Sequence, residues 1–318
     1  MVYVLFVVGF FLLIKWADLL VDWASSLAKR FSLSDMIIWL TIVAFGTSAP
    51  ELVVSLVSSV SWNSWLLLGN ILWSNIANII LILWISAAIY PLTLTKRTVF
   101  VEIPFSILAV ALLGILINEN FFGGTLSFIS RLDGIILLLF FALFMRYIIR
   151  ISKKHDDLPM EVNIQSMSLK KIIVYIVLWL SGLIVWWKWI VDGAIIIAQS
   201  FGIAESVIGL SIVAIWTSLP ELATSIVAVM KKKSDIAIWN VVVYNIFNIL
   251  WILWISAVIS PISSGVHTNR DIGFTFLVSC LLFVFVLLGK KFVLQRYQWP
   301  IMILLYILYM GIIFWTWS

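Results

Sequence analysis

The sequence predicts an all-α polytopic membrane protein of ten transmembrane helices, arranged as two inverted five-helix repeats. Three observations predict this fold class: the composition, the spacing of apolar segments and an internal repeat. Hydrophobic residues make up 64% of the 318 residues and charged residues only 11%, which excludes an ordinary water-soluble fold. The net charge of +5 arises from short basic clusters between apolar segments, so it indicates membrane orientation and not nucleic-acid binding.

Ten apolar segments follow one another, and most have about the 20 residues that a helix needs to cross a hydrocarbon core. They cover residues 2–28, 35–60, 65–90, 98–117, 131–151, 170–198, 205–230, 235–260, 271–289 and 299–317. Polar or turn-forming residues separate them, for example Pro91 and Pro261. The first segment lacks a basic leader and a small-residue cleavage site, so we expect a retained helix and not a signal peptide.

One longer hydrophilic segment divides the chain into two halves. Residues 152–169 are expected to form a cytoplasmic linker between a first repeat over residues 1–151 and a second over residues 170–318. Of the 20 Lys and Arg residues, 16 fall in loops on one side of this topology. The positive-inside rule then places both termini outside.

The internal repeat is the most specific signal in the sequence. At a constant offset of 170 residues, residues 46–51 match residues 216–221, and three asparagines of the first half match Asn240, Asn245 and Asn248 of the second. Five helices, an odd number, separate matching positions, so the second half is expected to be upside down relative to the first. Inverted repeats are common in secondary transporters, which bind substrates near the midplane where broken helices meet.

Each copy of the repeated motif places a proline and a carboxylate inside an apolar segment. Pro50 and Pro220 cannot donate a backbone hydrogen bond, so we expect each helix to open beside its glutamate. An ionisable residue at membrane depth is costly and marks a functional site by default. Opening the helix also frees carbonyl oxygens, such as those of Ala44 and Ala214, to coordinate a cation.

Oxygen atoms from both copies therefore make up the predicted cation site. The carboxylates, hydroxyls and amide oxygens come from Glu51, Glu221, Thr47, Ser48, Thr217, Ser218, Asn78 and Asn248. An all-oxygen shell suits calcium, magnesium or sodium, and it is wrong for zinc or copper. The two carboxylates balance one divalent ion, and sodium ions bound to the same oxygens would exclude it.

The paired motifs, each followed by an asparagine-rich helix, resemble the prokaryotic type of the sodium/calcium exchanger family of the cation/calcium antiporter superfamily. The resemblance covers nearly the whole chain. It implies electrogenic exchange of several Na⁺ ions for one Ca²⁺ by alternating access, with both ions as transported substrates and no organic cofactor. The ligand positions that it implies are Ala44, Thr47, Ser48, Glu51, Ser74, Asn78, Ala214, Thr217, Ser218, Glu221 and Asn248.

The same resemblance sets the expected surroundings and partners. We expect an integral protein of a prokaryotic cell (inner) membrane, with a lipid bilayer around it, Ca²⁺ and Na⁺ as ligands and no nucleic acid. A monomer is the expected assembly. The protein is not expected to be an enzyme, because the paired-aspartate and His-Glu-x-x-His motifs of intramembrane enzymes are missing.

Several tryptophans stand where the other half of the repeat has glycine. The pairs are Trp23 with Gly193, Trp39 with Gly209, Trp216 with Gly46 and Trp239 with Gly69. Exchanging glycine for an indole at a packed position should be destructive. We therefore hypothesise that many of these tryptophans are glycines misassigned in translation, for instance from an organism in which a stop codon encodes glycine. The alternative is genuine tryptophan that fills a divergent interior.

Other interpretations stay open beside sodium-coupled calcium exchange. Glutamates also bind protons, so proton/calcium exchange, or exchange of another divalent cation, is the alternative function. A chain with so many bulky substitutions that it cannot transport is a third. Tyr244 replaces Ser74 in the repeat and is not counted as a ligand. Asn75 and Asn245 are expected to pack or bond to backbone, and Glu102 and Asp133 to serve in orientation or capping.

Overall fold

The computed structural model describes residues 47–118, 127–152, 217–230, 234–288 and 292–317, with a few isolated positions elsewhere. Within these residues the chain is almost entirely helical. Six helical segments are long and apolar enough to cross a membrane, and Pro50–Val60 and Leu219–Met230 are shorter apolar helices. The protein is thus a mostly helical integral membrane protein.

The first half begins, within the described residues, with the motif helix and a long central helix. The elements are α4 (Ala49–Val60), α5 (Ser64–Ala77), the π-helical turn η2 (Asn78–Ile82), α6 (Leu83–Ile89), β1 (Leu92–Thr93), the π-helical turn η3 (Thr98–Glu102), α7 (Ile103–Ile117), β2 (Phe128–Ile129) and α8 (Arg131–Ser152).

The second half repeats the first five elements of this order and then differs in its short turns. Its elements are α12 (Leu219–Met230), α13 (Ser234–Phe247), the π-helical turn η6 (Asn248–Ile252), α14 (Leu253–Ile259), β3 (Ile262–Ser263), α15 (Thr268–Leu288), β4 (Val293–Leu294), the 3₁₀ turn η7 (Arg296–Gln298) and α16 (Trp299–Trp317). From α4 to β1, every element boundary recurs 170 residues later, from α12 to β3. The repeat therefore extends to secondary structure.

Six predicted segments agree with observed helices to within three residues. Helical residues 64–89, 98–117, 131–152, 234–259, 268–288 and 299–317 correspond to them in order. Of the segments 35–60 and 205–230, the structure describes the parts from Thr47 and Thr217 onward. The segments 2–28 and 170–198 and the linker 152–169 lie outside the described residues, apart from isolated positions. The full set of ten helices and the inversion of the halves therefore stay predictions.

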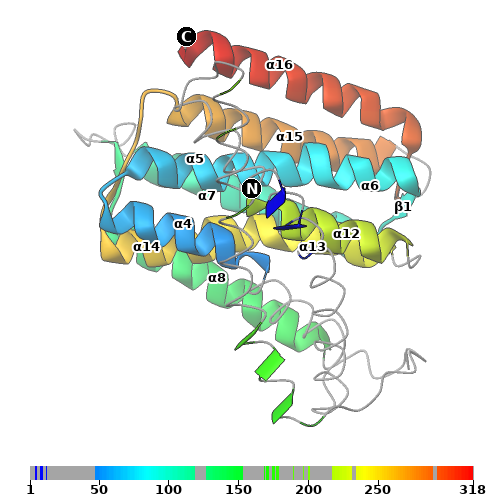
Figure 1. The fold of residues 1–318 in the computed structure, drawn as a ribbon, viewed down its shortest axis with the longest axis horizontal. Coiled ribbons are helices and arrows are strands. Elements are labelled where there is room, and N and C mark those ends of the chain that lie inside the picture. The colour runs from blue at the N-terminus through cyan, green and yellow to red at the C-terminus, as the bar shows by residue number, and fades with distance from the viewer. Residues whose placement is uncertain are drawn as a thin grey trace.

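Two long helical segments form the centre of the molecule. In the apolar window of Ser64–Ile89, 89% of the residues are buried, and in that of Ala237–Ile259 72% are, against 22% for Arg296–Ile313. Figure 1 shows α16 outermost on one side, next to α15, and α8 outermost on the opposite side. The peripheral helices expose apolar side chains such as Leu139, Leu143 and Leu304, which suits contact with lipid.

The two halves are joined by exchanged strand pairs and by close helix packing. Strand β1 of the first half pairs antiparallel with β4, and β2 pairs antiparallel with β3. Helix α8 approaches α14 at Gly134, where an added Cβ would lie 3.1 Å from the Ala257 Cβ atom and 3.4 Å from the Trp254 carbonyl oxygen. A side chain at this position would require its neighbours to move by a few tenths of an ångström, so glycine favours the close approach.

Candidate cation site

Both motifs interrupt their helix at the serine that precedes the glutamate by three residues. Ser48 lies in a turn with φ −79° and ψ 4°, and α4 begins directly after it with Pro50 in its first turn. The same turn occurs at Ser218, and Leu52 and Leu222 each donate a backbone hydrogen bond to the corresponding serine carbonyl at 3.0 Å. The predicted opening of the helix would lie at this turn, and the residues on its other side, before Thr47 and Thr217, lie outside the described residues.

This opening places both glutamates in the first turn of a new helix. The amino-terminal end of a helix carries a partial positive charge, which favours a carboxylate there. Glu51 and Glu221 are each only 1% exposed, and within the described residues one oxygen of each, Oε2, accepts no hydrogen bond. Among those residues neither carboxylate forms an ion pair with Lys or Arg. Two buried carboxylates in this state require a neutralising partner.

Hydroxyl groups of the second motif gather over the glutamate of the first. The Ser218 Oγ atom lies 3.5 Å from Glu51 Oε1, and the Thr217 Oγ1 atom lies 3.2 Å from Ser74 Oγ. The Thr217 hydroxyl also lies 3.3 Å from the Asn70 side-chain oxygen, which can only accept. Asn70 in turn donates to the Glu51 carbonyl oxygen at 3.3 Å. The two motifs, far apart in sequence, thus form one buried polar cluster.

Four asparagines from the central helices hold each other in a reciprocal arrangement, here called the asparagine ring: Asn75, Asn78, Asn245 and Asn248. The Asn75 amide donates to the Asn245 carbonyl oxygen at 3.1 Å, and the Asn245 amide donates to the Asn75 carbonyl oxygen at 3.2 Å. The Asn245 side-chain oxygen accepts from the Asn78 amide at 3.0 Å, and the Asn75 side-chain oxygen accepts from the Asn248 amide at 2.9 Å. The expectation that Asn75 and Asn245 bond to backbone is confirmed.

The asparagine ring fixes which end of each outer amide is available. Asn78 and Asn248 use their NH₂ groups within the ring, so their Oδ1 atoms are left, and among the described residues these oxygens have no hydrogen-bond partner. Both side chains are 1% exposed. A buried acceptor without a donor is unfavourable unless a cation or water meets it. The ring therefore presents two amide oxygens of the kind that hard cations prefer.

A widened helical turn begins at each of these two asparagines. The π-helical turns η2 and η6 start at Asn78 and Asn248, and their matching bounds make them a paired feature. Single π turns inside α-helices occur frequently at functional sites. The sequence analysis missed both turns. The recurrence of asparagine at the same place in each half was the one signal available.

Nine of the eleven predicted ligand residues can be placed, and all nine are at most 5% exposed: Thr47, Ser48, Glu51, Ser74, Asn78, Thr217, Ser218, Glu221 and Asn248. The Thr47 hydroxyl lies beside the Glu221 carboxylate, which mirrors the hydroxyls around Glu51. The backbone oxygens of Ala44 and Ala214 lie outside the described residues. Asn70 and Thr224 also touch this cluster, through hydrogen bonds to the glutamate backbone, and sequence reasoning did not find their contacts.

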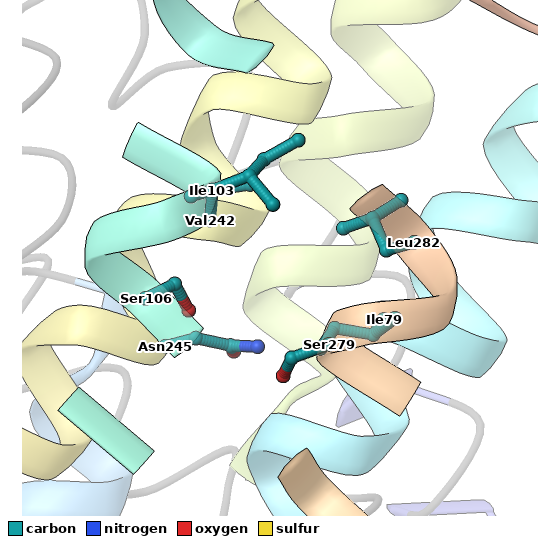
Figure 2. Close-up of a pocket in the computed structure, with 7 residues that line it drawn as sticks. All are labelled: Ile79, Ile103, Ser106, Val242, Asn245, Ser279 and Leu282. Carbon is teal, nitrogen blue, oxygen red and sulfur yellow. The ribbon is translucent and has the colours of Figure 1, made fainter. Parts of the chain in front are cut away.

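A separate small cavity lies between the central helices and the helices α7 and α15. Its volume is about 10 Å³, close to the minimum for a single water molecule. Figure 2 shows Ser106, Asn245 and Ser279 at one end and the apolar side chains of Ile103 and Leu282 at the other. Asn245 is the one member that it shares with the asparagine ring, so the cavity adjoins the polar cluster without holding its carboxylates.

Two further acidic residues have structural partners. Asp133 accepts hydrogen bonds from the Ser130 backbone N–H at 2.7 Å and from the Ser130 hydroxyl at 2.6 Å, which confirms a capping role at the start of α8. Glu102 is fully buried and accepts from Arg97 at 3.2 Å and from the Tyr147 hydroxyl at 2.8 Å. The Oε2 atom of Glu102 has no hydrogen-bond partner among the described residues, but its Oε1 atom is paired with a cationic side chain.

The fold and the buried oxygen cluster define an integral membrane protein of the ion-transport class. The chain belongs to the sodium/calcium exchanger protein family, which it matches over residues 1–150 and 171–315. It is therefore a membrane antiporter, and the family consists of transporters and not of enzymes.

Individual relatives agree with this assignment. The chain is 35% identical to a protein of Alkalimonas amylolytica described provisionally as the antiporter CaxA, over 96% of this chain and 97% of that protein. It is 34% identical to the inner membrane protein YrbG of Escherichia coli, over 81% and 79% of the two chains. A structure of the sodium-calcium exchanger NCX_Mj, soaked with 10 mM Na⁺ and 10 mM Sr²⁺, is similar with a TM-score of 0.78 and 28% identity, covering 98% of this chain and 97% of that one.

Proposed function

We propose that this protein exchanges Na⁺ for Ca²⁺ across a prokaryotic cell membrane by alternating access. The single observation that carries the proposal is the pair of buried carboxylates, Glu51 and Glu221, which no described cation neutralises. The family and the similarity to NCX_Mj supply the two ions, and the name of YrbG favours an inner membrane.

Calcium would lie between the two carboxylates, which together balance its charge. The free Oδ1 atoms of Asn78 and Asn248 and the Ser48 hydroxyl, which has no partner among the described residues, would complete an oxygen shell. Sodium ions bound to the same oxygens would displace calcium. Binding of the two cations is then mutually exclusive, as antiport requires.

Alternating access follows from the same charges. An empty site leaves two desolvated carboxylates, whereas an occupied site is neutral, so crossing of the loaded protein has the lower barrier. The reciprocal bonds of the asparagine ring support a two-fold relation between the halves, from which an outward-open and an inward-open state arise by exchange of roles.

The test is uptake of ⁴⁵Ca into proteoliposomes loaded with Na⁺. We expect uptake when the external Na⁺ is low, and its loss in Glu51→Gln and Glu221→Gln, because each variant leaves one uncompensated positive charge on bound calcium. Glu102→Gln is the matched control, since Glu102 is as deeply buried but bonds to Arg97 and Tyr147. Uptake by either site variant at the wild-type rate would refute the proposal.

Proton/calcium exchange is the second candidate. Each glutamate has one oxygen without a hydrogen bond among the described residues, and such an oxygen can carry a proton in place of a cation. An imposed proton gradient without Na⁺ is therefore run beside the sodium gradient. Uptake driven by the proton gradient alone would assign the protein to this alternative.

A further inference from the structure

The two halves of the cation site are not equivalent. We call the hydroxyls of Ser74, Thr217 and Ser218 around Glu51 the first compartment. Its counterpart under the 170-residue repeat, the second compartment, consists of Tyr244, Thr47 and Ser48 around Glu221. The one chemical difference between the two sets is a phenol in place of the Ser74 hydroxymethyl group.

Tyr244 is buried inside the second compartment. Its side chain is 1% exposed, and its hydroxyl lies near the hydroxyls of Thr47 and Thr224 and near the carboxylates of Glu221 and Glu51. Among the described residues, none of these contacts is a hydrogen bond of regular geometry. A phenol side chain is larger than a serine side chain by a whole ring, so Tyr244 occupies more of the second compartment than Ser74 occupies of the first.

The supports of the two compartments differ as well. In the first, Asn70 donates to the Glu51 carbonyl oxygen and to the Ser55 hydroxyl, both at 3.3 Å. In the second, the corresponding Asn240 NH₂ group and Ser225 hydroxyl have no partner within the described residues. The Glu221 carbonyl oxygen accepts instead from Thr224, at 3.0 Å, and the first half has Val54 at that position. The hydrogen bonds that support the two glutamates therefore differ between the compartments.

We propose that Tyr244 closes the second compartment to cations and makes the exchange electroneutral, at two Na⁺ for one Ca²⁺. This inference rests on the proposed sodium/calcium exchange. Monovalent cations would bind in each open compartment and between the glutamates, so closing the second compartment would leave two positions, and two Na⁺ carry the same charge as one Ca²⁺. Two Na⁺ ions or one Ca²⁺ ion each carry a charge of +2, which neutralises the two carboxylates. No net charge therefore crosses the membrane in a complete cycle. Electrogenic exchange, which the family resemblance implies, would need a third sodium position.

The decisive measurement is the equilibrium accumulation of ⁴⁵Ca as a function of membrane potential. Proteoliposomes with a fixed Na⁺ gradient are clamped at several potentials with K⁺ and valinomycin. If one net charge moved in each cycle, 100 mV would change the accumulation ratio about 50-fold. For the wild-type protein we expect no change with potential. For Tyr244→Ser, which restores the residue type of the first compartment, we expect the roughly 50-fold dependence that a third sodium ion produces.

Tyr244→Phe distinguishes the effect of the ring, which it keeps, from the effect of the hydroxyl, which it removes. The ring still fills the compartment, so accumulation should remain independent of potential, whatever the transport rate. A potential-dependent wild-type protein would overturn the proposal, and so would a transporting Tyr244→Ser variant without potential dependence. If Tyr244→Ser does not transport, the count of ²²Na ions exchanged per ⁴⁵Ca ion in the wild-type protein decides, and any ratio other than two contradicts the proposal. Absence of sodium-driven uptake in the wild-type protein would instead refute the exchange function itself.

Discussion

Amide orientation decides what the central asparagines can bind. The side-chain amides of Asn75 and Asn245 each donate to the backbone of the other residue, so their Oδ1 atoms accept from Asn248 and Asn78, respectively. The Oδ1 atoms of Asn78 and Asn248 then point away from these hydrogen bonds and are left without a donor among the described residues. Asn75 and Asn245 are thus positioning residues, and they touch no ion in the proposed site. The arrangement gives a neutral contribution to the shell, so the charge of the site comes from the two glutamates alone.

Replacement of one positioning residue should weaken calcium binding more than turnover. Asn75→Ala removes the acceptor of the Asn248 amide, which is then free to rotate, and losing a buried hydrogen bond costs about 1–3 kcal/mol. We expect the KM for calcium to rise roughly tenfold, at an unchanged amount of protein in the membrane. Asn118→Ala is the control, because Asn118 exchanges similar hydrogen bonds with Asn269 at an exposed position. An unchanged KM in Asn75→Ala would show that the ring does not orient the ligand.

The tryptophan hypothesis concerns single residues too. Trp239, opposite Gly69 in the repeat, is only 7% exposed, and its indole N–H has no partner among the described residues. A buried indole normally donates a hydrogen bond, but the indoles of Trp73 and Trp84 also lack a hydrogen-bond partner among the described residues, so this observation does not distinguish Trp239 from them. Trp39 and Trp216 lie outside the described residues. We expect the genomic DNA to carry a reassigned stop codon at positions 39, 216 and 239, whereas TGG codons there would refute the hypothesis.

The sequence identified the ligand types but not their mutual contacts. Glu51 and Glu221 could be found because a carboxylate in an apolar segment has few explanations and because both recur in register. The asparagine ring could not, since a reciprocal bond depends on how closely two helices approach, and no pattern along one helix encodes that distance. Tyr244 was recognised as a departure, but its place beside Thr47 and Thr224 depends on packing.

At the scale of helices, close approach between α8 and α14 depends on a missing side chain. In Gly134→Val, the valine Cβ atom would lie about 3.1 Å from the Ala257 methyl group, which is closer than ordinary van der Waals contact. The valine would also add two methyl groups. Overpacking of this kind costs about 1–3 kcal/mol. We expect a lower midpoint of thermal unfolding in detergent, measured by the loss of the monodisperse peak on size-exclusion chromatography.

Gly273→Val provides the matched control for that experiment. Gly273 lies in α15, and an added Cβ would meet no atom of the described chain within 4 Å. The unfolding midpoint should therefore change little. An equal loss of stability in both variants would show that the effect arises from the loss of glycine as such and not from the α8–α14 contact.

Helix bounds were predictable where polar or turn-forming residues end an apolar segment, for example at Pro91 and Pro261. The π-helical turns were not, because an asparagine followed by apolar residues does not distinguish a π turn from a regular α-helical turn. The interruption at Ser48 and Ser218 was predictable in kind, since proline removes a backbone donor. Its exact position was not, because the turn precedes the proline by two residues in both halves.

For the whole molecule, the distribution of positive charge predicts one orientation. Cys280→Ser removes the single native cysteine. A new cysteine introduced into one loop of this variant can then show on which side of the membrane that loop lies. We expect Lys96→Cys to react with an impermeant maleimide only from the cytoplasmic side and Arg270→Cys only from the outside. The opposite result, or labelling of both from one side, would contradict the predicted topology.

Every bond of the asparagine ring, and both strand pairs, run from one half of the chain to the other. An ancestor of half this length would leave all of these groups unsatisfied, unless a second copy inserted in the opposite direction completed them. Fusion of two duplicated genes would preserve that dimer within one polypeptide and release each copy from the need to match itself. Tyr244 opposite Ser74 is a substitution that a fused chain can carry once, whereas a self-pairing chain of half this length would carry it twice.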